Sequence, residues 1–257
     1  MIKSLQNSAA GINSQQSRID ATASNVAGVN TDTFKRQRVS FSDLVYEKLA
    51  GSGLPVKPGA DPAQGSGSRQ VAVLRNFDQG VLRETGRETD LAVSGRGFFK
   101  LTLPDGRTAY TRYGGFKVSA QGELVSEEGY SLYPGVVLPQ GFQEVMVDRN
   151  GKISARGADG EVSELADLTL SNFINPAALE PLGGGLFAAT DQAGPEEEVV
   201  PGQNGLGEII QKNLESSNVD LAAEMTELLE SQKAYQVNAR ALRTSDEIWS
   251  MANNLRK

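Results

Sequence analysis

The sequence predicts an α+β protein with long N- and C-terminal helices packed as a coiled coil and a β-rich, mainly antiparallel central domain. Three observations lead to this prediction. Apolar residues at both ends of the chain recur at an average spacing of 3.5 residues, the spacing of coiled-coil helices. The stretch between the two ends consists of short apolar runs bounded by turn residues. The chain has 257 residues, enough to bury a substantial core.

The N-terminal helix is predicted from an apolar row that alternates spacings of three and four residues. The residues between its positions are polar, so a helix here buries one narrow stripe. We call this row the N-terminal seam, and it consists of Ile2, Leu5, Ala9, Ile12, Gln16, Ile19, Ala23 and Val26.

The C-terminal helix is predicted from the same alternation. Ser217 to Asp220 resemble a capping box, in which a small polar side chain accepts first-turn amides and an acidic residue follows three positions later. The helix is expected to run to about Leu255, with its seam packed on the N-terminal seam or on neighbouring subunits. This C-terminal seam consists of Leu221, Met225, Leu228, Gln232, Tyr235, Ala239 and Leu242.

Composition divides the chain into three parts. Residues 1–33 and 218–257 form the helical domain. Residues 34–80 are expected to be an extended arm, because 50–69 consist mainly of Gly, Pro, Ser and Ala. Residues 81–217 are expected to form the β-rich outer domain with a return strand. Pro104–Gly106 and Arg149–Gly151 each lie between alternating segments, as hairpin turns do.

The composition also excludes most catalytic chemistry. The chain has no His and no Cys, which removes disulfides, His- or Cys-based zinc sites and every Ser-His or Cys-His catalytic pair. A net charge of −7 argues against general binding to a phosphate backbone, so no nucleic-acid partner is expected. We therefore predict no enzyme activity, no catalytic residue, no cofactor and no metal site.

Two short motifs were weighed for chemistry and rejected. Gly95–Phe99 lacks the third glycine and the following helix of a nucleotide-binding loop, so it is expected to be a glycine-rich bend that enters a strand. Glu196–Glu198 is the densest acidic cluster. Because adjacent residues of an extended chain point to opposite faces, we expect a solvated loop there rather than a cation site.

The ends of the chain carry no recognisable membrane or secretion signal. The first residues contain no unbroken apolar run followed by a small-residue cleavage site, so no Sec signal peptide is expected. No stretch has the length of apolar sequence that spans a bilayer.

Two long motifs, one near each end, resemble the signatures of the bacterial flagellar rod and hook proteins. Residues 5–44 resemble the N-terminal signature, with a helix-ending motif at Asn25, Asn30, Thr31, Phe34 and Lys35. Residues 207–257 resemble the C-terminal signature, which here includes Leu214, Glu215, Ser217, Asn218, Val219 and Asp220. Residues 90–134 and 170–187 resemble central segments of the same family.

The N-terminal motif departs from the usual family pattern at two positions. Gly28 stands where the family usually has Asn, and Thr33 stands where it usually has Gly. A β-branched residue tolerates positive φ poorly, so we expect this turn to be built differently if the family glycine adopts that conformation.

The resemblance implies a structural subunit of the flagellar basal-body rod, on the distal-rod branch of the family. Such a subunit assembles into a helical tube, with its terminal coiled coil on the inner wall, and transmits motor torque to the hook. The resemblance also implies contacts with other rod and hook proteins and export, without a cleaved Sec signal, through the flagellar type III apparatus. The predicted assembly residues are the apolar seam residues Ile2, Leu5, Ile12, Ile19, Val26, Leu221, Met225, Leu228, Tyr235 and Leu242.

Two alternatives remain open at this stage. One is a proximal rod or other rod-like basal-body protein. The other is an envelope peptidoglycan hydrolase that carries filament-type ends.

Overall fold

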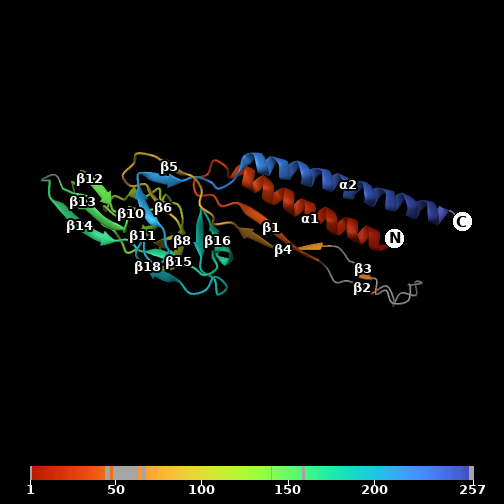
Figure 1. The fold of residues 1–257 in the computed structure, drawn as a ribbon, viewed down its shortest axis with the longest axis horizontal. Helices are drawn as coiled ribbons and strands as arrows, with labels where there is room; N and C mark the ends of the chain where they lie inside the picture. Colours follow the sequence, from red (N-terminus) through yellow and green to blue (C-terminus); the bar gives the residue numbers. More distant parts are fainter. Residues whose placement is uncertain are drawn as a thin grey trace. The chain divides into compact units, whose positions relative to one another are not determined.

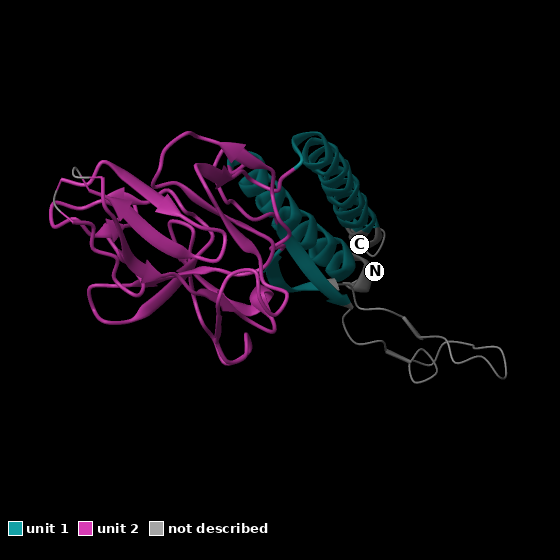
Figure 2. Cartoon of the chain, turned by 60° about the vertical axis from the view of Figure 1, so that its left-hand side comes forward, with its two compact units in different colours: residues 1–27, 37–75, 220–257 teal, residues 28–36, 76–219 magenta. Residues whose placement is uncertain are grey.

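The fold was obtained as a computed structural model, which describes residues 2–43, 47–48, 63–64, 68–139, 141–157 and 160–254 (Figure 1). The chain divides into two compact units (Figure 2). Unit 1 contains residues 1–27, 37–75 and 220–257, and unit 2 contains residues 28–36 and 76–219. Residues 49–62 and 65–67 of the predicted arm lie outside the described residues.

Unit 1 is built from two helices and an antiparallel ribbon. Helix α1 (Ile2–Ala27) lies beside helix α2 (Leu221–Asn254) and also contacts strands β1 (Gln37–Asp43) and β4 (Ser68–Arg75) (Figure 1). Strands β1 and β4 pair antiparallel with an irregularity between Ser40 and Phe41, and β2 (Glu47–Lys48) pairs with β3 (Ala63–Gln64). The expected α+β class and terminal helices are therefore present.

The predicted coiled coil, in contrast, is wrong. A coiled coil buries both alternating rows of its seam, but α2 leaves Leu221 and Met225 43% and 53% exposed. Ala9, Gln16 and Ala23 of the N-terminal seam and Gln232 of the C-terminal seam are also exposed. The remaining described seam residues are only half-buried: Leu5, Ile12, Ile19, Val26, Leu228, Tyr235, Ala239 and Leu242. The side chain of Ile2 lies outside the described residues.

Small and polar residues are buried on both helices, where apolar residues were expected. Among the side chains that the structure describes, the buried ones are Ser14, Thr22 and Asn25 on α1 and Glu224 and Ser231 on α2. At Gly11, a Cβ atom would lie 2.7 Å from the Asn238 amide nitrogen, so glycine allows a close approach of the helices. Helix α1 packs against both α2 and the β1–β4 ribbon. Its buried residues therefore do not coincide with the apolar residues spaced every three or four positions.

Unit 2 is a set of antiparallel sheets, as predicted. The largest sheet has the order β16-β17-β8-β7-β11-β10-β9, formed by β7 (Phe99–Thr102), β8 (Thr108–Thr111), β9 (Lys117–Val118), β10 (Leu124–Val125), β11 (Ser131–Leu132), β16 (Glu180–Gly183) and β17 (Leu186–Ala188). A three-stranded sheet contains β12 (Glu144–Val147), β13 (Lys152–Arg156) and β14 (Val162–Asp167). The remaining strands form the pairs β5 (Leu82–Glu84) with β20 (Asn213–Glu215), β6 (Leu91–Ser94) with β19 (Glu208–Gln211), and β15 (Leu170–Asn172) with β18 (Glu197–Val199). A short 3₁₀ helix, η2, spans Pro176–Ala178.

The core of unit 2 follows from strand periodicity. On β7, Phe99 and Leu101 are fully buried while Lys100 and Thr102, which alternate with them, are not. A second apolar cluster places Phe77 edge-on to Phe98 and Phe187, with ring centroids 5.3 and 5.2 Å apart, respectively. This contact anchors the segment 76–80 to the sheet.

Both predicted hairpin turns are present. Gly106 lies between β7 and β8 with φ 80°, and Gly151 lies between β12 and β13 with φ 86°. Glycine adopts this left-handed conformation without the Cβ clash of other residues.

The expectation of a solvated loop at Glu196–Glu198 is wrong. Residues 197–199 form β18, and the carboxylates of Glu196 and Glu198 both pair with Lys100. Glu196 also accepts hydrogen bonds from Tyr110 (2.8 Å) and Ser171 (2.7 Å). The alternation of side chains was inferred correctly, but it directs two acids to one face, where a lysine from β7 neutralises them.

We expect replacement of Glu196 by Gln to remove a pH-dependent part of the stability. Burial raises the pKa of Glu196, but hydrogen bonds from Ser171, Tyr110 and Lys100 outweigh burial and leave it lowered from the ordinary 4.5. A carboxyl group whose pKa is lower in the folded chain than in the unfolded chain stabilises the fold at pH values above its unfolded pKa. This contribution is lost as the pH falls through its folded pKa. Urea unfolding should show a loss of about 1 kcal/mol at pH 7 that shrinks below pH 4.5.

The matched control is Glu197→Gln, because Glu197 is exposed on the opposite face of the same strand. This variant should follow the pH dependence of the unmodified chain. A Glu196→Gln deficit of the same size at pH 3 and pH 7 would contradict the assignment.

Candidate functional site

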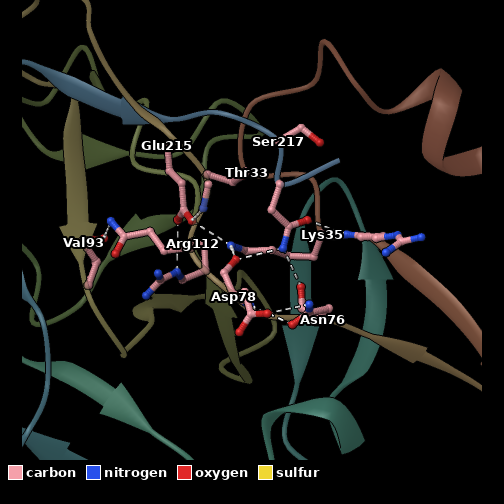
Figure 3. Close-up of polar contacts among 12 residues, drawn as sticks. Thr33, Lys35, Asn76, Asp78, Val93, Arg112, Glu215 and Ser217 are labelled. Carbon is pink, nitrogen blue, oxygen red and sulfur yellow. Dashed lines mark hydrogen bonds and ion pairs between the residues drawn. The ribbon is translucent and has the colours of Figure 1, made fainter. Parts of the chain in front are cut away.

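The two family motifs meet in unit 2 around the carboxylate of Glu215. Strand β20 pairs antiparallel with β5, with Leu214 opposite Arg83, and the Thr33 amide donates a hydrogen bond to the Glu215 carbonyl, which joins residues 28–36 to the C-terminal motif. The Lys35 ammonium lies 2.7 Å from Glu215 Oε1, and Arg112 Nε lies 3.2 Å from Oε2 (Figure 3). The side chains of Lys35, Arg112 and Glu215 are 1%, 4% and 0% exposed, and we call them the ion cluster.

Backbone groups make further hydrogen bonds with the ion cluster. The Gly80 amide donates to Glu215 Oε1 at 2.7 Å, and Lys35 donates to the Asp78 carbonyl at 2.9 Å. Arg112 donates to the carbonyl oxygens of Gly95 and Gly97. These glycines have φ of 119° and 129° between β6 and β7, so the expected glycine-rich bend is confirmed, and it supplies acceptors for a buried arginine.

Burial and pairing oppose each other in this cluster. Burial lowers the pKa of Lys35, and the Glu215 carboxylate acts in the opposite direction. The pKa of Arg112 is lowered for the same reason, again opposed by Glu215. Two buried cations therefore depend on one carboxylate, and removal of that carboxylate leaves both without an acidic partner in the cluster.

Asn218 connects the same segments a second time. Its Oδ1 accepts a hydrogen bond from the Arg36 amide at 2.8 Å. Its Nδ2 donates hydrogen bonds to the carbonyls of Asn76 and Asp78 at 2.9 and 2.8 Å. One side chain thus satisfies backbone groups of two segments that have no regular strand pairing with residues 216–219.

The structure corrects the expectation that the turn at Thr33 is built without positive φ. Thr33 adopts φ 58°, the left-handed conformation itself. Its amide donates to the Glu215 carbonyl at 2.7 Å, and its hydroxyl donates to the Asp32 carbonyl at 2.7 Å. The conformation costs a β-branched residue about 1–2 kcal/mol, and these contacts hold it in place.

Gly28, the other departure from the family pattern, faces the ring of Phe34. A Cβ atom at position 28 would lie 2.5 Å from that ring, so the ring would have to move for any larger residue. Thr31 donates its amide to the Gly28 carbonyl at 3.1 Å, which closes the turn after α1. Asn30 and Thr31 are exposed, whereas Phe34 is partly buried.

The other motif residues form a polar contact within unit 1. Asn25 is buried, donates to Glu224 Oε2 at 2.9 Å and exchanges two hydrogen bonds with the backbone of Gln37. Asp220 caps α2, since its Oδ1 accepts the amides of Ala222 and Ala223. The predicted capping box is therefore displaced. In unit 2, Ser217 Oγ accepts a hydrogen bond from the Val219 amide at 3.3 Å, and Val219 is partly buried.

Sequence reasoning missed Arg112, Asp78 and Gly80. Arg112 follows β8 on the same face as buried Tyr110, so strand periodicity alone could have indicated an inward-facing arginine. Asp78 and Gly80 contribute backbone groups, which leave no signal in side-chain patterns.

Two family models match the chain and define the class of protein. The model described as "Flagellar hook protein FlgE/F/G D1 domain" matches residues 92–155, a range that contains Arg112. The model described as "Flagellar basal body rod FlgEFG protein C-terminal" matches residues 210–255, a range that contains Glu215 and Asn218. Both matches indicate the class of flagellar hook and basal-body rod proteins.

Curated relatives narrow the class. Proteins named "Flagellar basal-body rod protein FlgG" are 37% identical in Borreliella burgdorferi, over 100% of both chains, and 36% identical in Agrobacterium fabrum, over 98% of both. The protein of the same name in Caulobacter vibrioides is 34% identical over 99% of this chain and 100% of its own length. The chain belongs to the flagellar basal-body rod protein family, on its distal-rod (FlgG) branch.

Family membership settles two expectations from the sequence. The chain is a structural subunit of the flagellar basal body, so the predicted absence of enzymatic function is confirmed and the hydrolase alternative is removed. The distal-rod branch is favoured over the proximal one by the full-length relatives. In the part of the chain that the structure describes, neither helix is apolar enough over sufficient length to cross a membrane.

We expect the Thr33→Gly variant to be more stable toward unfolding than the Thr33→Ala variant, whereas alanine is usually the more stabilising of the two residues. Glycine avoids the left-handed strain that Ala retains, and this gain of about 1–2 kcal/mol exceeds the extra freedom glycine gives the unfolded chain, about 0.4–1 kcal/mol. Chemical unfolding of Thr33→Gly and Thr33→Ala measures the difference.

Thr102, exposed on β7, provides the control pair of substitutions. There the Thr102→Gly variant should be less stable than the Thr102→Ala variant. Both residues adopt the φ of a strand, so only the larger conformational entropy of glycine in the unfolded chain separates them. The same order at both positions would contradict the role of φ at Thr33.

Proposed function

We propose that this rod subunit self-assembles into a helical tube that transmits motor torque to the hook. Membership of the rod family supports the setting, and the surface of α2 supports self-assembly. A heterologous contact repeated by a screw operation produces an open helical filament. A rod needs no catalytic chemistry, only many repeated lateral contacts between subunits.

The observation that carries this proposal is the inverted polarity of α2. Met225, Leu229 and Val237 are 53%, 57% and 63% exposed, and Met251 is 58% exposed. On the same helix, Glu224 and Ser231 are each only 1% exposed. A helix of an isolated globular protein normally buries its apolar residues and exposes its polar ones. The apolar residues of α2 are thus available to neighbouring subunits.

The predicted seam residues remain part of this proposal as subunit contacts. Met225 and Leu221 are exposed on α2, while Leu5, Ile12, Ile19, Val26, Leu228, Tyr235 and Leu242 retain part of their surface. In the tube, residues 1–33 and 218–257 would form the inner part and residues 81–217 the outer part, with 34–80 as the arm. Neighbouring copies would then cover the apolar surface that a single chain leaves exposed.

We also propose other rod and hook proteins as partners, and export through the flagellar type III apparatus without a cleaved Sec signal. Membership of the flagellar rod family supports both. An axial subunit contacts the next protein along the same shaft, and the continuous shaft is what carries torque.

We expect Leu229→Glu to abolish assembly without unfolding the monomer. Leu229 is 57% exposed, so a charge there costs little in the free chain but would have to be desolvated in a subunit contact. Electron microscopy and sedimentation of the purified full chain should show tubes for the unmodified protein and none for the variant. Circular dichroism should show equal helix content.

Leu229→Met is the matched control, because it keeps an apolar side chain at the same position, and it should assemble normally. Tubes formed by Leu229→Glu would exclude this part of α2 from the interface. An unmodified chain that stays monomeric at all concentrations would contradict self-assembly itself.

A further inference from the structure

The strongest feature that the rod function leaves unexplained is the concentration of long-range contacts at the ion cluster. Glu215 lies 180 residues after Lys35 and 103 after Arg112. Asn218 lies 182 residues after Arg36, whose amide it accepts. Most surface ion pairs of unit 2 are exposed and join residues that pair across neighbouring strands or turns, such as Arg156 with Glu144. The ion cluster instead joins the two ends of the chain.

We propose that residues 28–36, 76–84 and 213–219 form a clasp, a cooperative unit that closes only when the C-terminal segment is in place. Residues 28–36 and 213–219 are joined by four contacts. These are the Lys35–Glu215 ion pair and three hydrogen bonds, from the Thr33 amide to the Glu215 carbonyl, from the Arg36 amide to Asn218 Oδ1, and from the Asn218 amide to the Phe34 carbonyl. The middle segment joins both. The Gly80 amide donates to Glu215 and Asn218 donates to the Asn76 carbonyl, while Lys35 donates to the Asp78 carbonyl.

Electrostatics makes closure conditional on Glu215. Within the cluster, Glu215 is the only carboxylate that pairs with Lys35 and Arg112, among the residues that the structure describes. Without it, closing residues 28–36 on the sheet buries two cations beside each other, an arrangement that folded proteins avoid. The open arrangement, in which Lys35 reaches water, is then the more stable one.

Backbone strain acts in the same direction. Thr33 adopts φ 58°, and its amide is held by the Glu215 carbonyl. When residues 213–219 are absent from the clasp, Thr33 loses the hydrogen bond of its amide, and the cost of this conformation is opposed by local bonds such as those from the Thr33 hydroxyl to the Asp32 carbonyl and from the Phe34 amide to the Thr31 carbonyl. Both strain and charge therefore favour an open N-terminal motif until the C-terminal motif arrives.

The consequence concerns the order of folding. A chain delivered from its N-terminus has most of unit 2 available for folding before residue 215, but it cannot close the clasp. Residues 28–36 directly follow α1 in the chain and 213–219 lie just before α2, so closure reports that the chain has been delivered as far as the start of α2. If the proposed self-assembly holds, the clasp withholds a complete unit 2 from chains that lack residues 213–219.

Hydrogen exchange on the full-length protein tests the clasp through amides that a substitution does not touch. Asn218→Ala removes the acceptor of the Arg36 amide, but the clasp predicts at least tenfold faster exchange also at Thr33 and Gly80, which bond to Glu215. Glu215→Gln should accelerate exchange reciprocally at Arg36. Amides in the three-stranded sheet β12–β13–β14 should keep their rates in both variants.

Glu208→Gln is the matched control, since Glu208 forms a half-exposed ion pair with Arg149 elsewhere in unit 2. It should leave the exchange rates of all clasp amides unchanged.

Faster exchange restricted to the direct partners of each substituted side chain would overturn the cooperativity of the clasp. Equal acceleration in the β12–β13–β14 sheet in Asn218→Ala would also overturn the clasp, because the contacts would then be ordinary core contacts. If Glu215→Gln fails to fold, the Asn218→Ala measurement alone decides. These readouts are independent of polymerisation, so failure of the clasp and failure of self-assembly are distinguishable.

Discussion

The rest of unit 2 depends on one constraint: two buried cations, Lys35 and Arg112, need the carboxylate of Glu215. A buried charge without a partner is among the most costly features a protein can contain, so the three side chains must meet or remain in water. Because they come from distant parts of the chain, their meeting determines the path of both family motifs. The strained turn at Thr33, the glycine bend at Gly95–Gly97 and the contacts of Asn218 all follow that path.

Unit 1 follows a different physical rule that suits a subunit of a larger assembly. Its helices meet through small and polar residues, with Asn25 bonded to Glu224 and Gly11 facing Asn238. Apolar residues such as Met225 and Leu229 remain outside this contact. This exposed apolar surface is what the proposed contacts between subunits would bury.

The sequence was informative about the elements and less so about their pairing. Turn glycines and strand alternation predicted the hairpins at Gly106 and Gly151, because these signals are local. The heptad spacing predicted both helices but assigned the wrong buried face, since an apolar stripe does not specify whether its partner lies in the same chain. The family motif identified Lys35 and Glu215 without their pairing, and Arg112 was missed, because contacts over 180 and 103 residues leave no periodic trace.

The most direct test of this account is the coupling free energy between Lys35 and Glu215. A double-mutant cycle with Lys35→Met and Glu215→Gln, followed by chemical unfolding, isolates the pair from the separate effects of each substitution. The account predicts a coupling of at least about 2 kcal/mol, well above the roughly 0–1 kcal/mol typical of an exposed pair such as Arg149 with Glu208. A Lys35–Glu215 coupling below about 0.5 kcal/mol would show that the two chain ends are held together by something other than the ion cluster.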